Sequence, residues 1–152
     1  MSKEKNAYKS EENLGFLLWH TNMIWQRKQN RALDIIGLTQ TQFAILSALN
    51  TLLKRSNSVT QKAIAERSNT DTMMVSKVLR TLEKKGVIDR KEHETDSRAK
   101  CVYITTFGVK TFQEAFEIVT TSNATFFSKL SDEDSFRKEL QQIIQFDKSL
   151  KK

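Results

Sequence analysis

The sequence predicts one mostly α-helical domain, residues 1–152, that carries a small β-hairpin. Three observations favour this fold class. Apolar residues recur at helical spacing through most of the 152 residues. Proline is absent and glycine occurs only four times, so few residues interrupt long helices. Apolar and polar residues alternate at residues 87–105, which is typical of two short strands.

The first helix is expected over residues 11–36, where leucine and isoleucine recur on one side. Phe16, Trp19, Met23 and Trp25 widen this apolar stripe beyond what one core face needs. A helix with so broad an apolar surface is either buried on more than one side or in contact with a partner chain. The residues alone leave both alternatives open.

The second helix has clear signals at its start. Gly37 stops the first helix, and Thr39 with Gln42 matches a capping box. The expected buried face of this helix consists of Phe43, Leu46, Leu49 and Leu53. The polar residues 54–58 then form a loop.

Two short helices separated by a turn follow the loop. Thr60 caps the first, which is expected over residues 60–66. A turn at residues 68–70 leads to a helix that is capped by Thr70 or Asp71 and extends to residue 85, where Gly86 ends it. The apolar face of this helix consists of Val75, Val78, Leu79 and Leu82.

A hairpin and two further helices complete the chain. Strands are expected over residues 87–92 and 100–105, and the charged residues 93–99 between them are too many for a tight turn. A long helix over 107–127 has its apolar residues at Val109, Phe112, Phe116, Val119 and Phe126. A capping residue followed by acidic residues starts the last helix, over 131–150.

The order of elements in residues 60–108 is the signature of a winged helix-turn-helix, which predicts binding to double-stranded DNA. The second helix of such a motif fits the major groove, where each base pair presents a distinct pattern of donors and acceptors. A net charge of +7 and a pI near 9.6 fit a polyanionic partner. The predicted DNA contacts are Thr60, Gln61, Thr70, Thr72, Met73, Ser76, Lys77, Arg80, Arg90, Asp96, Arg98 and Lys100.

These residues have different expected roles. Met73 is suited to contact a thymine methyl group, and Lys77 and Arg80 can reach guanine edges or phosphates. Arg98, at the hairpin tip, is suited to the narrow minor groove, and Asp96 either orients it or pairs with Arg90. Each feature alone also fits an ordinary solvated surface, and only their order and spacing favour DNA.

Several short motifs in residues 38–108 resemble the MarR family of bacterial transcriptional regulators. The matching motifs are Leu38-Thr39, Gln42-Phe43, Thr60-Gln61, Ile64-Ala65, Val75-Ser76-Lys77, Leu82 to Arg90, Asp96-Ser97-Arg98, Tyr103-Ile104-Thr105 and Gly108. The spacing from Gly86 through Asp96-Ser97-Arg98 to Gly108 is the most specific part of this match.

The resemblance implies a homodimer on a pseudo-palindromic DNA site. We expect a repressor, although the residues do not distinguish a repressor from an activator. The DNA-binding lobe would comprise residues 38–106, and the helices at 11–36 and 107–150 would interlace with those of the partner. This arrangement would account for surplus apolar residues at Phe16, Trp19, Phe112, Phe116, Phe136, Ile143 and Phe146. A two-fold dimer places its recognition helices about 34 Å apart on DNA.

The resemblance also implies a small ligand, often aromatic or phenolic, in a cleft between the dimer helices and the DNA-binding lobe. Phe16, Trp19, Trp25 and Phe43 are candidates to line it, although core packing also explains them. Peroxide-sensing members carry a reactive cysteine near the start of the first helix. In this chain residues 14–18 contain no cysteine, and the single cysteine, Cys101, is expected to be a buried or half-buried filler in a strand rather than a sensor.

Other functional classes have little support in the sequence. No HExxH, CxxC, P-loop or GxSxG motif occurs, and the two histidines are far apart, so we expect no enzyme, no cofactor and no metal site. The single cysteine and the short apolar runs favour a cytoplasmic protein without a membrane span. The alternative function is a winged helix that binds another protein.

Overall fold

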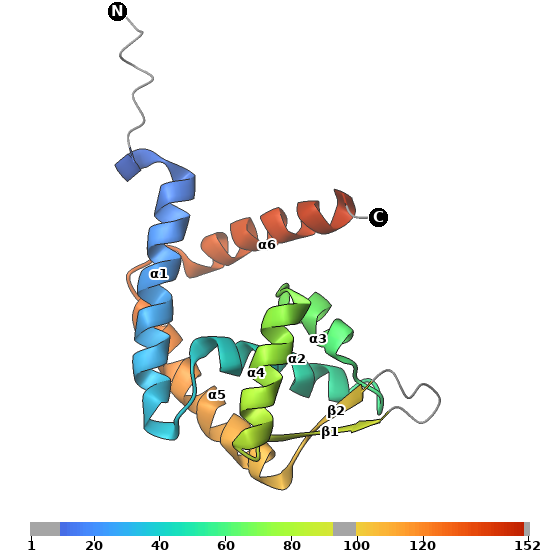
Figure 1. The fold of residues 1–152 in the computed structure, drawn as a ribbon. Coiled ribbons are helices and arrows are strands. Elements are labelled where there is room, and N and C mark those ends of the chain that lie inside the picture. The colour runs from blue at the N-terminus through green and yellow to red at the C-terminus, as the bar shows by residue number, and fades with distance from the viewer. Residues whose placement is uncertain (1–9, 93–99, 151–152) are drawn as a thin grey trace, which may run out of the picture.

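The computed structural model describes residues 10–92 and 100–150 as six α-helices and a two-stranded antiparallel hairpin (Figure 1). The helices are α1 (Leu14–Leu33), α2 (Gln40–Leu53), α3 (Gln61–Ser68), α4 (Thr72–Lys84), α5 (Thr106–Phe127) and α6 (Glu133–Leu150). The strands are β1 (Ile88–Glu92) and β2 (Lys100–Ile104), and the short 3-10 helices η2 (Ser10–Glu12) and η3 (Asp34–Ile36) flank α1. The predicted fold class is therefore confirmed.

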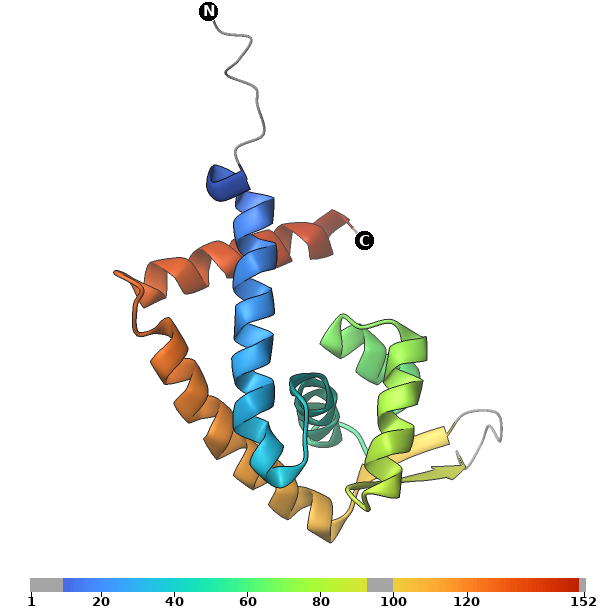
Figure 2. The same ribbon diagram turned by 60° about the vertical axis from the view of Figure 1, so that its left-hand side comes forward.

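The elements form a lobe and a set of long helices (Figures 1 and 2). Helices α2, α3 and α4 and the hairpin make the lobe, with α2 at its centre. Helices α1 and α5 pack against each other beside it. The first half of α1, the end of α5 and α6 lie at the end of the molecule that is farthest from the hairpin. No single described helix is long and apolar enough to cross a bilayer, although α1–η3 and α2, bent by 77°, meet that criterion together.

The core of the lobe is built around α2. Leu46 and Leu49 are fully buried, as predicted, and they share the core with Ile64, Leu79 and Val102 from the neighbouring elements. The single apolar face that was predicted for α2 is too narrow, because Ile45 and Ala48 are buried as well. A helix that is covered on several sides buries residues from more than one stripe.

The ends of the helices follow the capping signals. The Thr39 hydroxyl accepts the N–H of Gln42 at 3.1 Å, and the Gln42 side chain accepts the N–H of Thr39 at 3.2 Å, so the predicted capping box is present. The expected helix over 11–36 is shorter than predicted. Asn13 caps it by accepting the N–H of Phe16, and Leu33 is its last α-helical residue.

The hairpin has a third, very short partner that the sequence did not reveal. Strands β1 and β2 pair from Ile88 opposite Ile104 to Glu92 opposite Lys100. On the other edge of β2, Thr60 forms an isolated bridge with Cys101, and the Val102 N–H donates to the Val59 carbonyl at 2.8 Å. Strand β2 therefore lies between two partners.

Helices α5 and α6 differ most from the predicted apolar pattern. The buried residues of α5 are small ones, with Ala115 and Val119 facing the core, whereas Val109 and Phe116 are exposed. Close packing between α1 and α5 favours small side chains, which leaves several larger apolar residues of α5 outside. Every residue of α6 is exposed in the single chain. The expected cap, Ser131, is one residue too early, because the Asp132 carboxylate accepts the N–H of Ser135 at 3.0 Å.

Candidate nucleic-acid interface

A tight turn joins α3 to α4. Asn69 adopts a left-handed conformation with φ of 51°, which asparagine tolerates better than most residues. The Thr70 N–H then bonds back to the Ala65 carbonyl at 3.0 Å, which closes the end of α3. The Asp71 carboxylate accepts the N–H of Met74 at 2.8 Å and thereby caps α4. The turn thus sets the direction in which α4 leaves the lobe.

Helix α4 separates an apolar face from a polar one. The four predicted core residues, Val75, Val78, Leu79 and Leu82, are all buried. The outward face carries five of the predicted DNA contacts: Thr72, Met73, Ser76, Lys77 and Arg80. Four of these are exposed and Ser76 is half-buried, while Met73 reaches 83% exposure. This face is lined by short polar and cationic side chains that a DNA groove can accept.

Two predicted DNA contacts at the ends of α3, Thr60 and Thr70, already form local hydrogen bonds. The Thr60 hydroxyl accepts the Ala63 N–H at 3.2 Å and caps α3. The Thr70 hydroxyl donates to the Ser68 carbonyl at 3.1 Å. Both residues and Gln61 are half-buried. A phosphate contact by Thr60 or Thr70 would have to leave these local hydrogen bonds in place.

Arg90 pairs with Glu83 and so links β1 to α4. Its Nη2 lies 2.9 Å from Glu83 Oε1, its Nε donates to Oε2 at 3.4 Å, and its side chain is only 15% exposed. The hydrogen bond from Arg90 is the main reason why the pKa of the Glu83 carboxyl lies below its ordinary value, and the charge of Lys100 lowers it further. The pair therefore holds the hairpin against α4.

The hairpin carries further positive charge toward its tip. Lys100 is exposed at the start of β2, and the Lys91 ammonium group lies 5.7 Å from the centre of the Tyr103 ring. The predicted contacts Asp96 and Arg98 lie outside the described residues. Within the described part of the hairpin, Lys91 and Lys100 are therefore the exposed cations that a polyanion could reach.

A glycine and a threonine join the hairpin to α5. The Thr105 hydroxyl donates to the Gly86 carbonyl at 2.6 Å and accepts the Gly108 N–H at 2.9 Å. The backbone of Gly108 approaches the Val87 carbonyl so closely that no Cβ fits between them. Lys85 also ties the end of α4 to the Gly37 carbonyl. These contacts connect the lobe of α2, α3, α4 and the hairpin to the long helices.

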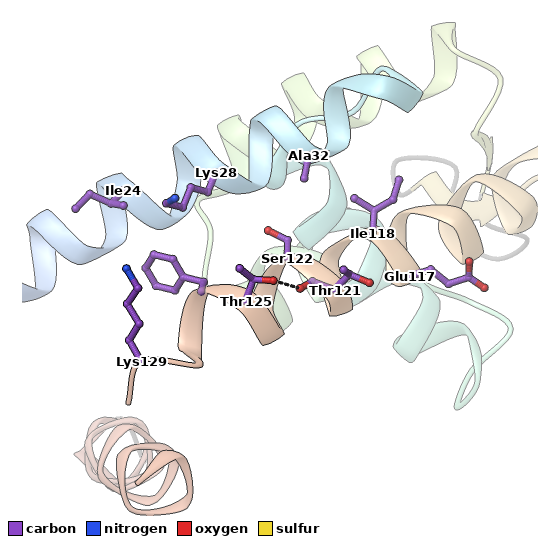
Figure 3. Close-up of a pocket in the computed structure, with 10 residues that line it drawn as sticks. Ile24, Lys28, Ala32, Glu117, Ile118, Thr121, Ser122, Thr125 and Lys129 are labelled. Carbon is purple, nitrogen blue, oxygen red and sulfur yellow. Dashed lines mark hydrogen bonds between the residues drawn. The ribbon is translucent and has the colours of Figure 1, made fainter. Parts of the chain in front are cut away.

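A cleft of about 820 Å³ lies between α1 and α5 (Figure 3). Its walls combine aliphatic residues, hydroxyl groups, one acid and two lysines. The lining residues are Ile24, Lys28, Ala32, Glu117, Ile118, Thr121, Ser122, Thr125, Phe126 and Lys129. Figure 3 shows Lys129 extending from the end of α5 toward α1. The two ammonium groups suit an anionic ligand with an apolar body.

The four aromatic residues predicted to line a ligand cleft do not meet in the structure. Phe43 is buried in the core and stacks on Phe112, with ring centroids 5.9 Å apart. Trp25 donates its ring N–H to Asn123 at 2.9 Å and so joins α1 to α5. Trp19, which is exposed, and Phe16, which is half-buried, lie nearer the N-terminal end of α1 than Trp25 does. None of the four lines the cleft between α1 and α5. Phe112, expected as a surplus residue, packs against the chain's own core.

Cys101 is buried, as predicted, and its Sγ lies 3.3 Å from the Ser58 hydroxyl. In residues 10–92 and 100–150, no three side chains of His, Cys, Asp or Glu gather in a way that could hold a metal ion.

Comparison with known proteins agrees with this geometry. A model of the MarR family matches residues 38–100. The HTH-type transcriptional regulator YdcH of Bacillus subtilis (strain 168) is 38% identical over 130 residues, which cover 86% of this chain and 88% of that protein.

Solved structures share the fold at lower identity. The S. aureus MepR–DNA complex has a TM-score of 0.76 and 24% identity, and the match covers 90% of this chain and 98% of that one. CouR from Rhodococcus jostii RHA1, bound to p-coumaroyl-CoA, has a TM-score of 0.76 and 20% identity, over 91% of this chain and 94% of that one. The family model and the similarity to YdcH together show that this chain belongs to the MarR family of transcriptional regulators.

Proposed function

We propose that two copies of this chain bind one double-stranded DNA site, with each α4 in a major groove, and repress transcription by occupying that site. The observation that carries the proposal is the outward face of α4. This face places Thr72, Met73, Ser76, Lys77 and Arg80 together, opposite a fully buried apolar face. The S. aureus MepR–DNA complex, which shares the fold, supports binding of DNA by this chain, and the second helix of a helix-turn-helix is the element that enters the major groove.

Exposed apolar side chains on the long helices support a homodimer. They come from the first half of α1, from α5 and from α6, and they are large. The set comprises Leu14, Leu17, Leu18, Trp19, Phe116, Phe136, Leu140, Ile143, Ile144, Phe146 and Leu150. Many large apolar side chains exposed on a few helices favour an interface. The long helices would then hold two DNA-binding lobes at a fixed spacing, and the dimer would act in the cytoplasm, where the DNA lies.

Selection of bound duplexes from a random library tests this function. We expect a two-fold symmetric sequence whose half-sites are about one helical turn apart, and an affinity that falls steeply as salt rises. A folded dimer that selects no sequence and binds no duplex at low salt would instead favour the protein-binding alternative.

Replacement of Lys77 by alanine is expected to weaken binding to the selected duplex by about tenfold, because a base or phosphate contact is lost. The matched control is Lys138→Ala, since Lys138 is also an exposed helical lysine but lies on α6. Fluorescence anisotropy at one salt concentration measures both variants. Equal affinities for the Lys77 and Lys138 variants would contradict the placement of α4 in the groove.

We also propose that a small anionic ligand occupies the cleft between α1 and α5 and releases the DNA. A ligand can do so only by binding one spacing of the lobes more tightly than another. The support is the pair of lysines in a cleft with apolar walls, and the fold that this chain shares with CouR, which binds p-coumaroyl-CoA.

Benzoate at millimolar concentration is expected to raise the melting temperature of the protein, whereas benzyl alcohol, which lacks the charge, is not. Lys129→Ala should remove the shift with benzoate, and Lys110→Ala, a change of an exposed lysine on α5 outside the cleft, should leave it. Thermal unfolding with each compound measures this. Equal shifts for benzoate and benzyl alcohol would count against a charge-selecting cleft.

A further inference from the structure

The first turn of α4 exposes two thioether side chains. Met73 is 83% exposed and Met74 is 41% exposed, whereas Val75, Val78, Leu79 and Leu82 of the same helix are buried. An unbranched thioether at the surface is open to oxidants, since its reactivity depends on access and needs no activating neighbour. The helix that is proposed to contact bases therefore begins with an oxidisable side chain.

The thiol of this chain is much less accessible than these thioethers. Cys101 is 3% exposed, and the Ser58 hydroxyl lies 3.3 Å from its sulfur. Met23, the other methionine in the described residues, is half-buried on α1. Among the described residues, the sulfur atoms most open to an oxidant in solution are therefore those at the start of α4.

We propose that Met73 is an oxidation site for hypochlorous acid and that the resulting sulfoxide weakens DNA binding; the inference rests on the proposed binding of DNA by α4. The thioether sulfur attacks the chlorine of HOCl with a lone pair, and hydroxide leaves. Water then adds to the chlorosulfonium sulfur, chloride leaves, and proton loss gives the sulfoxide. Sulfur is oxidised by two electrons and chlorine is reduced to chloride, so the net products are the sulfoxide, a proton and chloride.

The change in polarity explains the expected loss of affinity. A reduced Met73 presents an apolar surface, which can pack on a thymine methyl group in the major groove. Its sulfoxide presents a strong dipole with a negatively polarised oxygen, directed toward base acceptors and phosphates. Reduction by a methionine sulfoxide reductase would restore the thioether, so the modification can serve as a reversible switch.

The test compares DNA affinity before and after oxidation within each variant of the full chain. Wild type, Met73→Leu and Met74→Leu are treated with HOCl, quenched with free methionine, mapped by peptide mass spectrometry and titrated with the selected duplex. In wild type, we expect one added oxygen on Met73 and a dissociation constant about tenfold higher after oxidation. The ratio of the two constants should be near one for Met73→Leu, whatever its own affinity, and as in wild type for Met74→Leu. Treatment with the reductase should reverse the change.

Three results would overturn the inference. They are unchanged affinity with Met73 mapped as the sulfoxide, a loss of affinity that persists in Met73→Leu, and dissociation of the dimer on oxidation, which size-exclusion chromatography would reveal. Failure of the proposed function is distinguishable, because untreated protein would then bind no duplex. Cys101→Ser, expected to remain as sensitive as wild type, tests whether the thiol is the target instead.

Discussion

Replacement of Ile143 by aspartate is expected to convert the protein into a monomer and to abolish specific DNA binding. Ile143 is 67% exposed on α6, within the apolar face that we assign to the dimer. A carboxylate that is buried there without a partner would cost several kcal/mol. Two-fold symmetry places the change in the interface twice. We expect the dissociation constant of the dimer to rise by about a hundredfold or more, which sedimentation over a range of protein concentrations measures.

Gln145→Asp is the matched control for this change. Gln145 is also exposed on α6, two residues farther along, but it lies on the polar side of the helix with Lys138 and Gln141. The variant adds the same charge near the same helix end, so any effect on the helix itself is shared. It should remain a dimer and bind the selected duplex. An Ile143→Asp protein that stays dimeric would show that α6 is not part of the interface.

Loss of the dimer should affect DNA binding more than loss of any one contact. A monomer presents one α4 instead of two, so it forfeits the second half-site and the fixed spacing of the two lobes. The exposed apolar residues belong to α1, α5 and α6, whereas Lys77 belongs to α4 of the lobe (Figure 1). Ile143 also lines a hollow with Thr70, Asp71 and Thr72 at the start of α4. The Ile143 variant therefore tests the dimer through sedimentation, and the Lys77 variant tests the DNA-reading face through affinity for the duplex.

Local signals in the sequence predicted the starts of α2 and α3 and the two faces of α4. Thr39, Thr60 and Asp71 each accept a backbone N–H in the structure, because a cap depends on residues within one turn. The sequence did not decide whether Thr70 or Asp71 caps α4. In the structure Asp71 is the cap, and the Thr70 hydroxyl donates to the Ser68 carbonyl instead. Periodicity predicted the buried face of α4, because that helix packs on a single core.

Features that depend on distant residues could not be predicted. Arg90 was expected beside DNA or Asp96, but its partner Glu83 is on a different element. Gln29 is an amide on α1, yet it is fully buried and donates to Gln40 of α2 at 3.4 Å. The walls of the cleft come from helices that are far apart in sequence, so no local pattern marks it. Residue type alone predicts burial poorly when two helices from different regions meet.

The joint between the hairpin and α5 is the second place where a small change should have a large effect. Gly108→Ala is expected to destabilise the fold by about 3 kcal/mol or more, because the new Cβ overlaps backbone atoms. This Cβ would lie well inside van der Waals contact of the Val87 carbonyl oxygen and 2.8 Å from Ile104 Cγ2. The Val87 carbonyl cannot move away without losing its bond from the Thr105 N–H, which is 3.1 Å long. Urea unfolding at a fixed protein concentration measures the change.

Two other glycines provide controls that separate overlap from backbone strain. Gly86 has φ of +76° but open space around it, so Gly86→Ala should cost about 1 kcal/mol, for the left-handed conformation alone. Gly15 is exposed in the first turn of α1, where its new Cβ would lie 3.1 Å from the capping Asn13 Oδ1 while alanine favours the helix, so Gly15→Ala should change stability by less than about 1 kcal/mol. The expected order of destabilisation is therefore Gly108, Gly86, Gly15. If Gly86→Ala proved the more damaging of the first two, the close approach of α5 to Val87 would not be what requires a glycine at position 108.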